Sequence, residues 1–138
     1  VGNFTVLSRA AAVMSQNAPD DDGQRGVCLG TASIAGFEGQ VGQTSYSAAK
    51  GGVIGMTLTA ARDMGPAGIR FMTIAPGTFH TYAYGDVPIE ALNDRFAKLI
   101  PNPKRMGHPD EYAKLAIQIF ENDFLNGYTI RLDGAQRF

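Results

Sequence analysis

Apolar residues recur at helical spacing in four stretches of the chain, and we predict a helix in each. The first covers residues 1–16, where apolar side chains lie three or four positions apart and a following Asn-Ala-Pro sequence ends the pattern. Residues 46–64 form the second, which is apolar nearly all round. The third covers residues 89–100, within an otherwise irregular stretch, and the fourth begins at Pro109, whose ring suits a first helical turn.

Three short apolar runs lie outside these helices and predict buried strands. Residues 26–32 and 69–75 are bounded by glycine or proline, and residues 128–132 follow an Asn-Gly turn. We expect the first of these strands to be covered on both faces. Strands that alternate with helices are typical of an α/β fold with parallel strands and right-handed crossovers. We therefore expect residues 1–138 to form a single α/β domain, and the sequence shows no internal repeat or linker.

Three glycines interrupt the helix at residues 46–64, namely Gly51, Gly52 and Gly55. Each would cost about 0.5–1 kcal/mol relative to alanine inside a helix. Such a cost is tolerated where a helix must approach another backbone closely. We therefore expect this glycine face to touch a neighbouring segment, either in the same chain or in another subunit.

The composition of the chain limits the classes of partner that the protein could bind. The chain has 138 residues, a formal net charge of −1 and 44% apolar residues, which indicates a globular domain with no electrostatic attraction to nucleic acid or anionic membranes. No apolar run approaches the ~18 residues of a membrane span, and the N-terminus has no secretory signal pattern. The lone Cys28 cannot form an internal disulfide. These features predict a cytoplasmic protein, or one of the mitochondrial matrix in a eukaryote.

Three features of the sequence resemble metal or phosphate sites, but the spacing of their residues does not support such a site. His80 and His108 have no partner at metal-ligand spacing, so we expect no metal site. The acidic run at residues 20–22 lacks the spaced ligands of a calcium loop. Glycines at positions 36, 39 and 42 do not match the dinucleotide pattern G-x-G-x-x-G, and we interpret them as part of a substrate loop.

Candidate chemistry centres on Tyr46 and Lys50, four residues apart at the start of a predicted helix, where they share a face. A phenol ionises near pH ~10 and is a weak base at neutral pH, whereas a nearby ammonium favours the phenolate. The pair could therefore transfer a proton to or from an alcohol or ketone. Ser33 follows a buried strand, where ligands of α/β sheets gather, and could meet the same substrate oxygen.

This spacing has a purely structural alternative. Tyr46 could be an ordinary buried aromatic residue whose neighbour Lys50 extends its ammonium group to solvent. The spacing of the three residues alone leaves both interpretations open.

Six short motifs resemble the short-chain dehydrogenase/reductase family in order and spacing. They are Thr31-Ala32-Ser33, Tyr46-Ser47-Ala48-Ala49-Lys50-Gly51-Gly52, Ile69-Arg70, Ala75-Pro76-Gly77, Asn126-Gly127 and Asp133-Gly134. The resemblance implies the C-terminal half of a Rossmann-like, doubly wound parallel sheet. It also implies that the N-terminal dinucleotide-binding half of such a domain is lacking here.

The resemblance implies roles for individual residues. Tyr46 would be the general acid/base, Ser33 would hydrogen-bond the substrate oxygen, and Lys50 would hold the nicotinamide ribose and favour the tyrosinate. The cofactor wall would consist of Pro76, Gly77, Phe79 and Thr81. Gln40 and Gln43 are candidates for substrate contact, with a solvated loop as the alternative.

Within the family, residues 37–43, 74–77 and 124–135 are most similar to a branch of 3-hydroxyacyl-CoA and 17β-hydroxysteroid dehydrogenases. This similarity implies an NAD-dependent enzyme, with NADP left open, that converts a secondary alcohol to a ketone, such as 3-hydroxyacyl-CoA to 3-oxoacyl-CoA. The glycine-rich face of the helix at residues 46–64 and the apolar C-terminal strand further indicate a homotetramer or dimer, of the type common in the family. The alternative is a truncated, inactive fragment that acts as an assembly or interaction module.

Overall fold

The three predicted strands form one parallel sheet in the order β1-β2-β3. A computed structural model describes residues 1–138, with β1 at Gly26–Thr31, β2 at Ile69–Pro76 and β3 at Thr129–Leu132. Gly26 pairs with Ile69, and Thr73 pairs with Thr129. Each connection between neighbouring strands passes through helix, as parallel pairing requires. The prediction of an α/β fold with a parallel sheet is confirmed.

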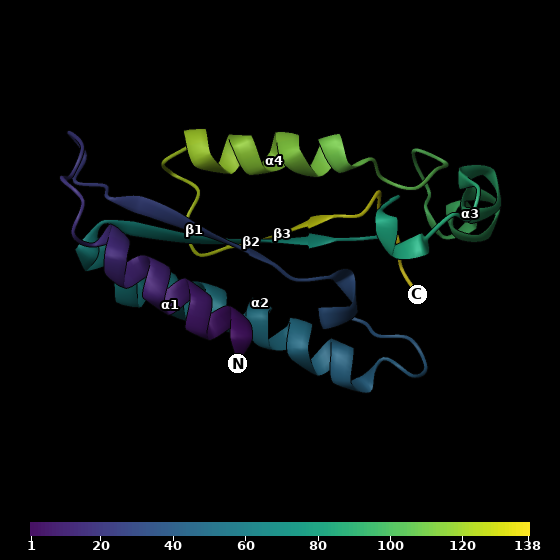
Figure 1. The fold of residues 1–138 in the computed structure, drawn as a ribbon, viewed down its shortest axis with the longest axis horizontal. Helices are drawn as coiled ribbons and strands as arrows, with labels where there is room; N and C mark the ends of the chain where they lie inside the picture. Colours follow the sequence, from purple (N-terminus) through teal and green to yellow (C-terminus); the bar gives the residue numbers. More distant parts are fainter.

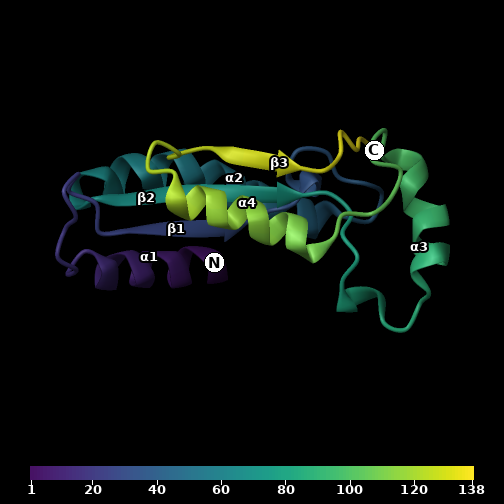
Figure 2. The ribbon, with the colours of Figure 1, turned by 90° about the horizontal axis from the view of Figure 1, so that it is seen from above.

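Helices cover both faces of this sheet (Figures 1 and 2). Helices α1 (Gly2–Met14) and α2 (Thr44–Met64) lie on one face, and α4 (Pro109–Glu121) lies on the other. Helix α3 (Ile89–Phe96) lies beyond the carboxyl ends of the strands and continues as a 3-10 turn to Leu99. All four predicted helices are present, although α2 begins two residues earlier than expected. None of them combines the length and the apolar character that a membrane crossing requires.

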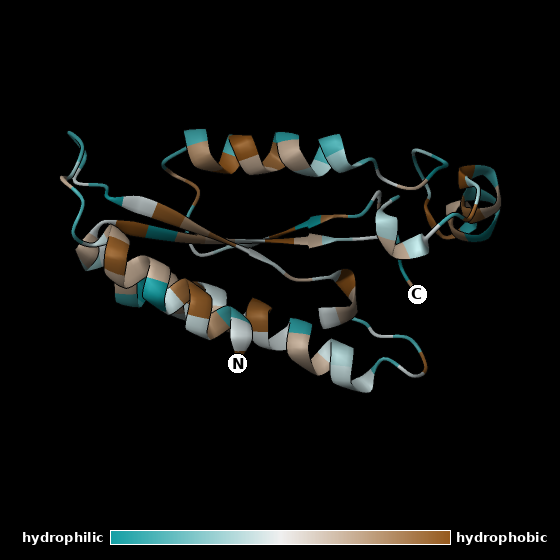
Figure 3. Cartoon of the chain, in the orientation of Figure 1, coloured by the Kyte–Doolittle hydropathy of each residue, from teal (hydrophilic) through white to brown (hydrophobic).

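The core lies on both sides of β2, which is buried from Ile69 to Ala75 and hydrophobic at most positions, with Arg70 and Thr73 as its buried polar residues (Figure 3). Side chains alternate, so Phe71 packs with Cys28 toward α1 and α2, while Ile74 packs with Ile119 of α4. Strand β1 departs from the prediction of full cover on both faces. Val27 and Leu29, which pack toward α4, are only half-buried, because within residues 1–138 β1 is the outer strand of the sheet and α4 is the one helix on that face.

The glycine face of α2 makes one close approach within the chain. A Cβ added to Gly36 would lie 2.9 Å from the carbonyl carbon of Lys50 and 3.0 Å from the nitrogen of Gly51. This contact presses the 3-10 turn Ile34–Gly36 against the first turns of α2. Gly52 and Gly55 have no atom within 4 Å of an added Cβ, so the close approach within the chain involves Gly51 alone. An approach of Gly52 and Gly55 to another subunit stays a prediction.

Arg70 ties the end of α4 to the central strand. Its Nη1 donates to the carbonyl oxygens of Ile119 and Leu125, both at 2.9 Å, and its Nη2 donates to that of Phe120 at 3.2 Å. Its Nε donates to Gln24 Oε1 at 2.9 Å. The carbonyls at the C-terminus of a helix have no partner within the helix, and this buried guanidinium supplies one.

The start of α4 is fixed by a carboxylate. Glu111 accepts two hydrogen bonds of 2.8 Å from the Arg105 guanidinium and one of 2.8 Å from the backbone N–H of His108. The Arg105 hydrogen bonds, followed by that of His108, lower the pKa of Glu111 to about 2. The carboxylate therefore stays charged and anchors the loop that leads into α4.

Candidate active site

A cleft of about 430 Å³ opens at the carboxyl ends of β1 and β2, the edge at which open α/β sheets bind ligands. Its walls come from these strand ends, the first turns of α2, the segment after β2 and the first turn of α4. Six of the predicted site residues line it, namely Tyr46, Lys50, Pro76, Gly77, Phe79 and Thr81. The structure thus gathers residues that lie 30 or more positions apart along the chain.

Tyr46 and Lys50 do not adopt the structural alternative. Tyr46 is 45% exposed rather than buried, and both side chains border the cleft from one face of α2. The Lys50 ammonium points inward, where its Nζ donates to the carbonyl oxygen of Thr31 at 2.9 Å. It lies 5.7 Å from the centroid of the Tyr46 ring. A positive charge is therefore held next to the phenol at the mouth of the cleft.

Thr31 and Tyr112 belong to this site although neither was predicted for it. The carbonyl of Thr31 holds Lys50, and its hydroxyl forms a 2.6 Å hydrogen bond with the Tyr112 hydroxyl of α4. The last residue of β1 is therefore joined to a helix on each face of the sheet. Thr31 is part of a family motif, whereas Tyr112 lies at an apolar-spaced position of the predicted fourth helix, and that spacing gives no sign of a polar contact.

Ser33 lies close to the cleft without lining it. It follows Ala32, which does line the cleft, and its Oγ accepts a hydrogen bond of 3.1 Å from the backbone N–H of Ala35. This bond caps the 3-10 turn Ile34–Gly36 and leaves the hydroxyl proton of Ser33 available to a substrate oxygen. The hydrogen-bonding role of Ser33 stays a prediction.

The structure does not bring the two predicted glutamines into the cleft. Gln40 and Gln43 lie in the loop after Ser33, where Gln43 Oε1 accepts a hydrogen bond of 2.9 Å from the backbone N–H of Gln40. Neither lines the cleft. Their position matches the solvated-loop alternative, and substrate contact stays a prediction.

Tyr84 adds a further phenol to the cleft. Its ring packs against Phe96 with 5.6 Å between centroids, and burial raises the pKa of the Tyr84 phenol. The residue therefore presents a neutral aromatic wall. Its segment, the 3-10 turn Tyr82–Tyr84, gave no periodic signal in the sequence.

Comparison with known proteins places the chain in a family. Residues 2–134 match the family profile described as "Enoyl-(Acyl carrier protein) reductase". The chain therefore belongs to the short-chain dehydrogenase/reductase family, as its motifs predicted.

Individual relatives are similar along almost the whole chain. The human "3-hydroxyacyl-CoA dehydrogenase type-2" is 56% identical over 137 residues, which are 99% of this chain and 52% of that protein. The crystal structure of 3-hydroxyacyl-CoA dehydrogenase type-2 from Mycobacterium avium superposes with a TM-score of 0.92 at 50% identity, over 99% of this chain and 53% of that one. The chain spans about half the length of the curated relatives it matches.

A second solved structure shares the fold at lower identity. A 3-oxoacyl-[acyl-carrier protein] reductase from Brucella melitensis, solved with bound NAD, has a TM-score of 0.76 and 28% identity, over 99% of this chain and 48% of that one. These structures confirm the prediction of a Rossmann-like α/β fold.

Proposed function

We propose that this chain is part of an NAD-dependent oxidoreductase that interconverts a secondary alcohol and a ketone, with 3-hydroxyacyl-CoA and 3-oxoacyl-CoA as the substrate pair. The observation that carries the proposal is the inward-pointing Lys50 beside Tyr46, at the carboxyl edge of a parallel sheet. The names of the similar proteins support 3-hydroxyacyl-CoA, a thioester, as the substrate.

The residues of the cleft suit proton transfer at an oxygen. In the oxidation, the oxygen of Tyr46 would take the proton of the substrate hydroxyl, and in the reduction it would return that proton. The Lys50 ammonium, fixed on Thr31, would stabilise negative charge that develops on the phenol oxygen. Ser33 would donate a hydrogen bond to the substrate oxygen.

The residues present fit the nicotinamide end of the cofactor. The cleft volume falls within the roughly 300–1,000 Å³ of ligand sites. Lys50 has donors left for ribose hydroxyls, because its one hydrogen bond within the chain uses one of three N–H groups. Pro76, Gly77, Phe79 and Thr81 would form the wall against the ring. When bound, the nicotinamide would accept or return the hydride.

The adenine end of the cofactor requires more than these residues. No G-x-G-x-x-G turn occurs among residues 1–138, and neither does the acidic residue that would follow such a turn and select NAD over NADP. The proposed activity therefore belongs to a protein that also supplies an adenine site. We propose NAD as the cofactor, with NADP as the alternative.

The test is turnover by the full-length protein. We expect reduction of NAD with 3-hydroxybutyryl-CoA, followed by the absorbance of the reduced nicotinamide, and weaker reduction of NADP. In calorimetry, residues 1–138 alone should show no micromolar affinity for NAD. If the full-length protein oxidises no 3-hydroxyacyl thioester, hydroxysteroid or simple secondary alcohol, the proposal is wrong and the inactive assembly module becomes the better account.

We also propose that the protein forms a homo-oligomer, a dimer or a tetramer. The supporting feature is an apolar groove of about 550 Å³ between α1 and α2, bordered by Phe4, Leu7 and Met56. Phe4 is 65% exposed, and such an apolar surface is typical of an interface. We expect sedimentation equilibrium to give a multiple of the protomer mass, reduced by Phe4→Asp. A monomeric wild type at micromolar concentration would contradict this.

A further inference from the structure

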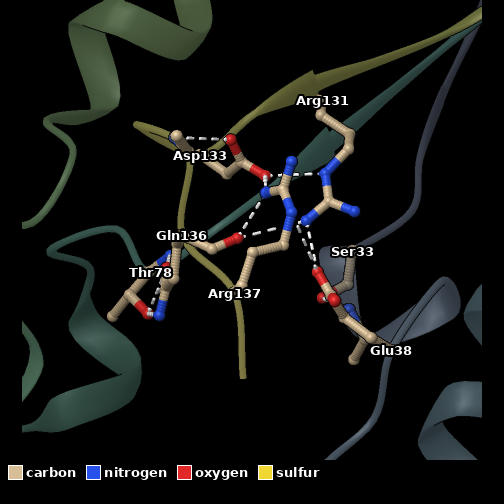
Figure 4. Close-up of polar contacts among 9 residues, drawn as sticks. Ser33, Glu38, Thr78, Arg131, Asp133, Gln136 and Arg137 are labelled. Carbon is tan, nitrogen blue, oxygen red and sulfur yellow. Dashed lines mark hydrogen bonds and ion pairs between the residues drawn. The ribbon is translucent and has the colours of Figure 1, made fainter. Parts of the chain in front are cut away.

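The end of the chain lies between the two loops that border the cleft. Figure 4 shows Ser33 and Glu38 on one side of Arg131 and Arg137, and Thr78 on the other side, next to Gln136. Ser33 and Glu38 belong to the loop that follows β1, whereas Thr78 belongs to the loop that follows β2. Residues 131–136, which we call the brace, contact both loops.

On the side of Ser33, the brace acts through Arg131. Its Nη2 donates to Glu38 Oε1, and its guanidinium lies 5.1 Å from the centroid of the Phe37 ring. Its Nε donates to Asp133 Oδ2 at 2.7 Å, and this second carboxylate contact fixes the orientation of the guanidinium. Glu38 is itself tied to the turn that begins at Ser33, because its backbone N–H donates to the Ile34 carbonyl at 3.0 Å. Arg131 therefore holds the Ser33 turn.

On the side of Thr78, the brace acts through Gln136, which is 0% exposed. Its Oε1 accepts from the backbone N–H of Thr78 at 2.9 Å, and its Nε2 lies 2.9 Å from Thr78 Oγ1, to which it donates. The brace also packs against Gly77, the residue before Thr78. A Cβ added to Gly77 would lie 2.8 Å from Gln136 Oε1 and 2.9 Å from Asp133 Cβ. Gln136 therefore fixes the wall proposed to hold the nicotinamide.

The two halves of the brace are joined directly. The same Nη2 of Arg131 that donates to Glu38 also donates to the backbone carbonyl of Gln136 at 3.2 Å. A continuous series of hydrogen bonds thus runs from Glu38 through Arg131 and Gln136 to Thr78. The first and last of these residues lie 40 positions apart and are joined here by the end of the chain.

We infer that Arg131 and Gln136 are positioning residues that set the Ser33 turn and the Gly77–Thr78 loop at a fixed separation. The inference rests on the proposed function, in which the first loop orients the substrate oxygen and the second loop orients the cofactor. Hydride transfer requires the two reacting groups to meet in one geometry, and a misplacement of about 1 Å can cost about 100-fold in rate. A brace that touches neither reactant would protect that geometry.

Hydrogen exchange tests the coupling without any turnover. We expect Glu38→Gln to speed exchange of the backbone amides of Gly77 and Thr78 as well as those of residues 36–38. Gln136→Leu should speed exchange in the same two segments. Gln118→Leu, on the exposed face of α4, is the matched control and should change neither. If each variant loosens only the loop that it contacts, or neither loop, the coupling does not exist.

Kinetics of the full-length enzyme test whether the brace contributes to catalysis. We expect Glu38→Gln to lower kcat/KM by about 10- to 100-fold and to raise the KM for NAD, although Glu38 lies on the substrate side. An unchanged KM for NAD would show a merely structural role and overturn the inference. Should Gln136→Leu fail to fold, the isosteric Thr78→Val, compared with Thr78→Ser, removes the same side-chain contact. A wild type without turnover would refute the proposed function. Hydrogen exchange would still test whether the brace couples the two loops.

Discussion

Replacing Tyr46 with phenylalanine should lower kcat for alcohol oxidation by about 100- to 10,000-fold, the range that a positioned acid/base contributes. The substitution removes one oxygen atom and keeps the ring. That oxygen makes no hydrogen bond within the chain, and the side chain is 45% exposed, so stability should not change. Steady-state oxidation of 3-hydroxybutyryl-CoA by the full-length protein measures the loss, and a urea unfolding curve verifies the fold.

The matched control is Tyr128→Phe, because Tyr128 is 70% exposed and precedes β3, outside the residues that line the cleft. It should retain full activity. If Tyr46→Phe retained more than half of the wild-type kcat, another group would have to carry the proton. Tyr84 and Tyr112 line the same cleft and would be the next residues to replace.

Most of the fold was predictable because its signals are local. Apolar spacing located every helix and strand, and glycine and proline marked their ends to within a few residues. Tyr46 and Lys50 were placed together for the same reason, since side chains four positions apart in a helix share a face. The family motifs added Pro76 and Gly77, which the strand end carries into the cleft.

The contacts that organise the site were not predictable in this way. Thr31 and Tyr112 are 81 positions apart, and Thr78 and Gln136 are 58 apart, so only the arrangement of the strands brings them together. Polar residues give no periodic signal when they are buried by tertiary structure. A glutamine near the end of the chain would ordinarily be taken as solvated, whereas Gln136 is fully buried and satisfied.

Arg70→Met should lower the free energy of unfolding by about 3 kcal/mol or more. Arg70 is 6% exposed and donates to the carbonyl oxygens of Ile119, Phe120 and Leu125. A buried acceptor left without a donor costs about 1–3 kcal/mol, and methionine fills much of the volume while donating nothing. The C-terminal end of α4 should then detach from β2. Urea unfolding followed by circular dichroism measures the loss.

Two further variants separate the hydrogen bonds from the charge. Arg70→Lys keeps the positive charge, but a single ammonium lacks the planar fork that reaches several carbonyls, so we expect an intermediate loss. Arg62→Met removes an exposed arginine from the last turn of α2 and should change stability by no more than about 0.5 kcal/mol. If Arg70→Met unfolded within 1 kcal/mol of the wild type, roughly the net worth of one hydrogen bond, water would be satisfying the carbonyls instead. The end of α4 would then be held by the apolar packing of Ile119 on Met72 and Ile74.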